Sequence, residues 1–132
     1  MKRNIDDCKK EILNDISRTI SFRLCSIGVD LGLFEDLSIN GPSSSKEIAF
    51  RKKYNERYVR EWLYGISKTG YIDFDRKTRK ASINDHYSEL FISEGGKNSF
   101  KGFFKVINNM MLPYENLISS FKNGGGIKFE EY

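Results

Sequence analysis

The chain has 132 residues, of which 39% are hydrophobic, 14% aromatic and 30% charged, and its formal net charge is +4. This length supports one domain with a hydrophobic core, and this composition excludes a disordered chain. The mildly basic balance permits contact with nucleic acid but does not require it.

The N-terminal residues 1–7 carry charges with no apolar stretch behind them, so they do not predict a signal peptide. No apolar run approaches the roughly 20 residues that a membrane helix needs. Both cysteines, Cys8 and Cys25, fall on one predicted helix and point to different faces, so we do not expect them to pair. These features predict a soluble cytoplasmic protein with reduced thiols and no membrane contact.

Residues 5–31 have the apolar repeat of a long helix, which Gly32 is expected to end. Such a stripe is longer than a small domain needs on one side. Two interpretations stay open, since interface helices and core helices share one pattern: a partner subunit covers part of the stripe, or later helices of the same chain cover it. For the first interpretation, the predicted dimer interface is Ile12, Ile16, Ile20 and Leu24.

A short helix over residues 46–51 follows the turn at Asn40-Gly41-Pro42. Ser44 and Glu47 have the spacing of a capping box at its start. Its inward side chains are expected to be Ile48, Ala49 and Phe50.

A second amphipathic helix is predicted after Asn55, whose side chain can cap its first turn. Its apolar face is expected to consist of Val59, Trp62, Leu63 and Ile66. The two helices and their tight turn form a helix-turn-helix unit.

A hairpin is predicted after Gly70, which can close the second helix. Residues 71–75 alternate between polar and apolar side chains, residues 75–79 form a charged loop, and residues 80–84 return as a second strand. A helix-turn-helix followed by such a hairpin is a winged helix. The predicted fold is therefore mainly α with a small antiparallel β-hairpin, and with extra helices at both ends of the winged helix.

The region after the wing has a rich apolar face between Phe100 and Phe121, on helices that Pro113 either separates or kinks. The core interpretation is favoured, because helical apolar stripes are usually buried. The alternative is the wall of a pocket for an apolar or aromatic ligand. That wall would consist of Phe103, Phe104, Met110, Met111 and Tyr114.

No catalytic, cofactor-binding or metal-binding residue is predicted. The single histidine, His86, is expected at the surface or at a helix start. No Cys/His/Asp grouping has the spacing of a metal site. A helix precedes Gly124-Gly125-Gly126, whereas a cofactor loop needs a strand before it, so these glycines are interpreted as a helix stop and linker.

A DNA-binding regulator is the alternative function, since a winged helix can read bases with its third helix and phosphates with its wing. Residues 51–53 form a further basic run. Glu56 and Glu61 on the third helix argue against DNA, and each can pair along the helix with an arginine. The residues that would contact DNA are Arg57, Arg60, Arg76, Lys77 and Arg79.

The order of several segments is similar to one known family. The segments are GLFEDL at residues 32–37, SSKEIA at 44–49, ERYVREWL at 56–63, GYI at 70–72 and GGGI at 124–127. They resemble the N-terminal winged-helix domain of class I S-adenosylmethionine-dependent methyltransferases. The run ERYVREWL is the most specific of them, and the likeness extends over nearly the whole chain.

This resemblance implies a dimerisation and substrate-lid domain over residues 1–123 and a glycine linker over residues 124–132. It implies a homodimer, with a small-molecule methyl acceptor and S-adenosylmethionine in the full-length family only. In that family a Rossmann-like catalytic domain follows the glycines. The chain ends at Tyr132, so we expect a truncated gene product, an excised domain or a stand-alone relic. In each case the chain is expected neither to bind the cofactor nor to transfer a methyl group by itself.

Overall fold

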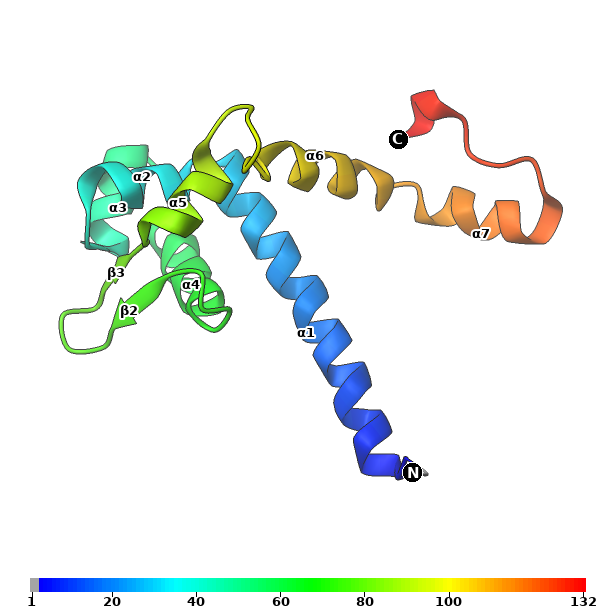
Figure 1. Cartoon of the computed structure of the whole chain (residues 1–132), viewed down its shortest axis with the longest axis horizontal. Coiled ribbons are helices and arrows are strands. Elements are labelled where there is room, and N and C mark those ends of the chain that lie inside the picture. The colour runs from blue at the N-terminus through cyan, green and yellow to red at the C-terminus, as the bar shows by residue number, and fades with distance from the viewer. Residues whose placement is uncertain (1–2) are drawn as a thin grey trace.

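The computed structural model describes residues 3–132 and consists of a compact body with two helical arms (Figure 1). The first arm is α1 (Ile5–Asp30), and the second is formed by α6 (Lys101–Met110) and α7 (Tyr114–Asn123). The arms leave the body in different directions, so that the two termini lie far from the body (Figure 1). Residues 1 and 2, which belong to the charged N-terminus and to the predicted 1–123 domain, lie outside the described residues.

The body is a winged helix-turn-helix, as predicted. Its sheet is antiparallel with the strand order β1-β3-β2, and Ala81 of β3 lies between Ser43 and Phe74. A short 3-10 helix, Phe129–Glu131, lies near the C-terminus. The body's elements in chain order are α2 (Leu33–Asn40), β1 (Ser43–Ser44), α3 (Ser45–Lys52), α4 (Glu56–Ser67), β2 (Asp73–Asp75), β3 (Lys80–Ser82) and α5 (Asp85–Ile92).

Local capping sets the starts of these helices. The predicted capping box of α3 is confirmed: the Glu47 N–H donates to the Ser44 hydroxyl at 3.3 Å, and the Ser44 N–H donates to the Glu47 carboxylate at 2.7 Å. The Asn55 side chain accepts from the Arg57 N–H at the start of α4. Gly32 ends α1 in the left-handed region, with φ of 64°, where a residue without Cβ has no steric penalty.

The structure corrects some details of the sequence prediction. Strand β1 was not predicted, because two residues are too short to show an alternating pattern. Strand β2 covers only Asp73–Asp75 of the expected 71–75. Phe50 is 87% exposed, because a helix that buries Ile48 and Ala49 turns the next position outward. Pro113 precedes a separate helix, α7, rather than kinking a longer one.

Trp62 is the centre of the core. Its ring is 3% exposed and lies edge-on to Phe34 at 5.1 Å between centroids. Its indole N–H donates to the Leu24 carbonyl of α1 at 2.8 Å. Next to this bond, a Cβ added to Gly28 would lie 2.5 Å from Trp62 Cζ2 and 2.6 Å from Phe34 Cε2. Only glycine at position 28 lets α1 approach the body this closely.

An ion pair with a buried carboxylate joins α2, α3 and β1. The Asp36 carboxylate accepts from Arg51 Nη2 at 2.6 Å and from Arg51 Nε at 3.0 Å, and the same Nη2 donates to the Ser43 hydroxyl. These bonds to Asp36 raise the pKa of Arg51. Arg51 is therefore paired within the fold while its side chain stays partly exposed, and its contact with phosphate stays a prediction.

We predict that Gly28→Ala lowers the free energy of unfolding by about 2 kcal/mol, because the added methyl group overpacks the contact with Trp62. Gly102→Ala is the matched control: it lies in α6 with nothing within 4 Å of the added Cβ, so its higher helix propensity should raise stability by up to about 1 kcal/mol. Urea unfolding at one fixed protein concentration measures both. Equal effects of the two variants would contradict the close packing at Gly28.

We also predict that the hydrogen bonds which Glu47 accepts from Ser44 and Lys80 stabilise the fold less at acid pH. Hydrogen bonds from the Ser44 backbone and hydroxyl, and then from Lys80, lower the pKa of Glu47 from 4.5 to about 2. A carboxyl group whose pKa falls on folding stabilises the fold above its unfolded pKa, and this contribution is lost as the pH falls from about 4.5 towards 2. Glu47→Gln should therefore lose less stability between pH 6 and pH 3 than the unmodified chain in urea unfolding. The exposed Glu61→Gln should behave like the unmodified chain, and a Glu47→Gln variant with an unchanged acid response would contradict this prediction.

Candidate functional site

Large apolar side chains lie uncovered along α1. Ile12, Ile16 and Ile20 are 61%, 51% and 56% exposed. Leu24, the fourth residue of the predicted interface, is instead half-buried against the core, where it touches Gly65. The exposed stripe continues at both ends of the helix, through Ile5, Leu13, Ile27 and Leu31.

The fully buried residues of α1, where it packs on the body, are small. Cys25, Ser26 and Gly28 are the buried residues of this helix. At about 100° per residue, Cys25 points to the opposite side of the helix from Ile16. The isoleucines therefore face away from the domain to which α1 is attached, although hydrophobic side chains normally face the core.

Helix α6 contacts α1 without covering this stripe. The rings of Phe22 and Phe104 stack at 5.3 Å, and Arg23 donates to the Asn108 side chain at 2.6 Å. The interpretation that later helices of the same chain bury the stripe is therefore wrong for Ile12, Ile16 and Ile20. The stripe remains open to another molecule.

A second apolar face lies on the other arm. Phe103, Met110, Met111 and Tyr114 are exposed, from 46% for Met111 to 64% for Tyr114. Phe104 alone of the predicted pocket wall is in the core, where it also meets Phe91 at 5.7 Å between ring centroids. The core interpretation is thus wrong for most of this face, because α6 and α7 lead away from the body (Figure 1).

The predicted pocket wall is divided between different surfaces. Phe103 borders a hollow of about 410 Å³ beside Gly95 and Gly96. Phe104 borders another hollow, of about 620 Å³, which lies against α1 and includes Phe22 and Tyr71. Cys25 also borders this second hollow, and burial raises the pKa of its thiol to about 12. This second hollow could not be predicted from the sequence, because most of the α1 residues that border it are polar and show no apolar repeat.

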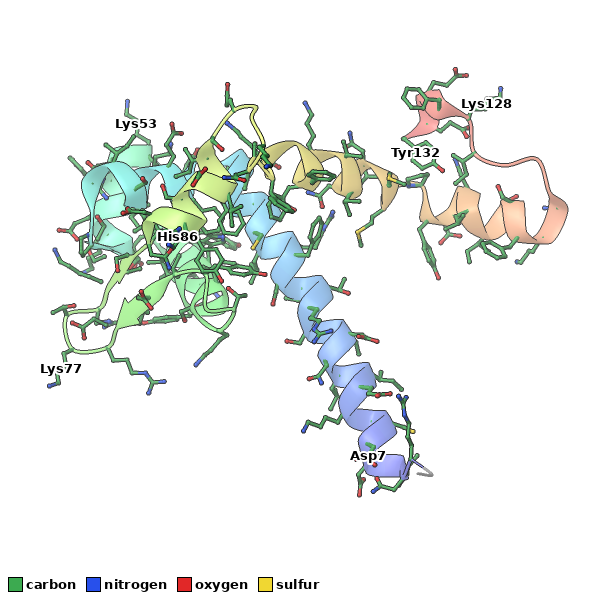
Figure 2. All side chains as sticks on the ribbon, viewed as in Figure 1. Asp7, Lys53, Lys77, His86, Lys128 and Tyr132 are labelled. Atoms are coloured by element: carbon green, nitrogen blue, oxygen red, sulfur yellow. The ribbon has the colours of Figure 1, made fainter. Side chains whose placement is uncertain are left out.

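Some of the basic residues predicted for DNA contact are engaged within the fold. Arg60 pairs with Glu56 at 3.4 Å, as the spacing suggested. The Arg79 guanidinium donates to the Tyr64 hydroxyl at 2.8 Å. Arg57, Arg76 and Lys77 are exposed, and Figure 2 shows Lys77 at the tip of the wing, pointing away from the body. The structure therefore gathers three of the five on the wing and leaves two on α4.

The described residues do not form a cofactor loop or a metal cluster. Gly124, Gly125 and Gly126 all have positive φ and follow α7, with no strand before them. This arrangement does not suit S-adenosylmethionine, whose loop joins a strand to a helix. Within residues 3–132, no three His, Cys, Asp or Glu side chains are close enough to share a metal ion. None of the described helices has the length and apolar character to span a bilayer.

A comparison with protein families matches residues 20–92 to the Rv2258c-like winged HTH domain. The match begins within α1 and ends with α5, so it includes the whole winged-helix body. Among curated protein sequences, none matches this chain significantly.

Solved structures share the fold over most of the chain. The mitomycin 7-O-methyltransferase MmcR aligns with a TM-score of 0.68 and 20% identity, over 90% of this chain and 35% of its own. PigF, solved with SAH, aligns with a TM-score of 0.72 and 16% identity, over 87% of this chain and 33% of its own. The N,N-8-amino-8-demethyl-D-riboflavin dimethyltransferase RosA from Streptomyces davawensis aligns with a TM-score of 0.70 and 14% identity. This alignment covers 93% of this chain and 35% of the RosA chain. The chain thus spans about a third of the length of these structures.

Proposed function

The chain belongs to the Rv2258c-like winged HTH domain family, and we propose that it is a non-catalytic domain that pairs the subunits of a methyltransferase and covers its methyl acceptor. The observation that carries this proposal is the exposed isoleucine stripe on α1, which faces away from the domain's own core. The similar methyltransferase structures support the proposal through their shared fold.

The proposed partner of the stripe is a second copy of this chain. Helix α1 has 26 residues, which corresponds to a length of about 39 Å. Two such helices related by a twofold axis would bury Ile12, Ile16 and Ile20 of each subunit, because a twofold interface uses the same surface on both sides. Leaving these side chains in water costs roughly 25 cal/mol per Å² of apolar area, which association would recover.

The proposed role of α6 and α7 is to cover a methyl acceptor. Phe103, Met110, Met111 and Tyr114 are exposed on this arm, and methionine side chains adapt to ligands of different shape. Two similar structures carry names that refer to mitomycin and to an amino-demethyl-riboflavin, so we propose a small-molecule acceptor here as well.

The methyl-transfer chemistry would come from a Rossmann-like domain that binds S-adenosylmethionine and supplies the methyl group. This chain would contribute no catalytic residue, and residues 124–132 would link the two domains. Helix α7 ends at Asn123, next to Gly124, which agrees with a boundary there. A cytoplasmic setting suits the proposal, because Cys8 and Cys25 are both free thiols.

We predict that the chain has the mass of two subunits in sedimentation equilibrium, and that Ile16→Asp converts it to a monomer. A carboxylate in the middle of an apolar interface would lose its hydration without a partner. Ile39→Asp is the matched control: Ile39 is 74% exposed but lies on α2, so this variant should keep the mass of the dimer. An Ile16→Asp variant that remains dimeric would exclude the stripe as the interface.

The alternative is a DNA-binding regulator, which is favoured by the exposed Arg76 and Lys77 on the wing. The carboxylate of Glu56 on α4 opposes it, because it neutralises Arg60 and accepts from the Ser45 hydroxyl. We predict no binding to a mixed-sequence DNA duplex even at low salt, measured by fluorescence anisotropy. Binding that weakens steeply between 50 and 200 mM salt, as phosphate contacts require, would support the regulator instead.

A further inference from the structure

A cleft of about 570 Å³ lies between the C-terminal half of α4 and the wing, which are neighbours in Figure 1. Its volume is within the range of sites that hold small ligands, about 300–1,000 Å³. It is separate from the α1 stripe and from the apolar face of α6 and α7, so the proposed function leaves it unexplained. The residues that border it include Tyr64, Lys68, Phe74, Arg76 and Arg79.

The cleft carries an excess of positive charge. Lys68, Arg76 and Arg79 border it together with a single carboxylate, Asp73. Among the described residues, none of these three cations forms an ion pair. The cleft is therefore positively charged and has room for an anion.

Arg79 is held in place for such a role. Its guanidinium donates to the Tyr64 hydroxyl at 2.8 Å, across the cleft from the wing to α4. Its backbone has φ of 56°, in the left-handed region that residues other than glycine rarely adopt. The hydrogen bond uses one of the five N–H groups of an arginine, so the others remain available for a ligand.

Aromatic rings form the apolar part of the cleft. Tyr64 and Phe74 pack edge to face, with ring centroids 5.4 Å apart and an interplanar angle of 83°. Ile72 also borders the cleft and is 3% exposed. A flat ring entering the cleft would therefore meet aromatic and aliphatic carbon, while its charged group met the cations.

The C-terminal end of α4 does not cancel this positive field. Free carbonyl groups at a helix end repel anions. Here the Tyr64 carbonyl accepts from the Ser67 hydroxyl at 2.8 Å, and the Ile66 carbonyl accepts from the Thr69 hydroxyl at 2.7 Å. These bonds reduce the negative character of the helix end beside Lys68.

We propose that this cleft binds a small aromatic anion, a ring that bears a phosphate or carboxylate group. Arg76, Arg79 and Lys68 would bind the anionic group, and Tyr64 and Phe74 would pack on the ring. A small ligand suits the cleft better than duplex DNA does, because the exposed Glu61 on α4 would meet the phosphate backbone of a duplex. Lys77 at the tip of the wing points away from the body (Figure 2) and does not border the cleft.

The test uses 1-naphthyl phosphate as the probe, with the full chain and ¹⁵N-labelled amide spectra. We expect saturable shifts confined to the C-terminal half of α4 and to the wing. Arg79→Gln and Arg76→Gln should each weaken binding at least tenfold. Lys77→Gln removes the same charge from the same hairpin without bordering the cleft, so it should change the affinity less than twofold.

Other ligands and the location of the shifts decide the outcome. We expect neutral 1-naphthol and inorganic phosphate to bind at least tenfold more weakly than the probe. The first lacks the anionic group, and the second lacks the aromatic ring. Equal binding of either compound would overturn the proposal, and so would shifts centred on Ile16 or Phe103. Binding to duplex DNA that Lys77→Gln and Arg79→Gln weaken equally would also overturn it. Amide spectra of each variant without ligand check that Arg76→Gln and Arg79→Gln remain folded, and either one suffices for the test.

Discussion

The contact between Trp62 and the end of α1 determines how the rest of the molecule is presented. The indole N–H binds the Leu24 carbonyl, and the ring lies against Gly28 at a distance that leaves no room for a Cβ. A hydrogen bond and a close backbone approach on one side of a helix fix its rotation about its own axis. Because that side carries Cys25, Ser26 and Gly28, the large apolar side chains must face outward. The packing at Trp62 thus sets the direction in which the isoleucines point, and they are exposed because residues 11–20 extend beyond the body, where every side of the helix is uncovered (Figure 1).

This geometry also separates three surfaces of the molecule. The α1 stripe is the surface that we propose pairs with a second copy of the chain, and the α6–α7 face is the surface that we propose covers a methyl acceptor. Two interactions hold the wing to the body: the ion pair between Lys80 and Glu47, and the hydrogen bond from Arg79 to the Tyr64 hydroxyl. These bonds hold Lys80 and Arg79 against the body, whereas Arg76 is exposed and Lys77 points away from the body at the tip of the wing. A winged helix that serves as a scaffold is consistent with this arrangement.

Much of the fold could be predicted from the sequence, because its signals are local. The capping residues Ser44 and Asn55 and the spacing of the apolar residues in α4 located the helix-turn-helix, and both caps are present. The burial of whole faces could not be predicted in the same way. An apolar stripe has the same period whether its own domain or another molecule covers it, so the face from Phe100 to Phe121 was assigned to the core, although of its side chains Phe104 alone is buried there.

The candidate sites depend on contacts between distant parts of the chain, and such contacts leave no periodic signal. The role of Arg51 as the partner of the buried Asp36 needs three elements to meet. The cleft at the wing needs Tyr64 and Arg79 to approach from separate segments. The sequence identified Arg76 and Arg79 as exposed cations, but not the aromatic rings beside them.

Cysteine cross-linking across the proposed twofold axis is the most direct measurement of the central claim, that α1 turns its isoleucines towards a second copy. In a chain with Cys8→Ser, where the remaining Cys25 is buried, one cysteine would be introduced in place of Ile12, Ile16 or Ile20, and Asn14 on the polar side of the helix would serve as the control. A residue near a twofold axis meets its own copy, and a disulfide forms when the two Cα atoms are about 4.4–6.8 Å apart. The account predicts a covalent dimer from at least one stripe position and none from Asn14→Cys. Cross-linking from Asn14→Cys alone, or equally from both sides of the helix, would contradict it.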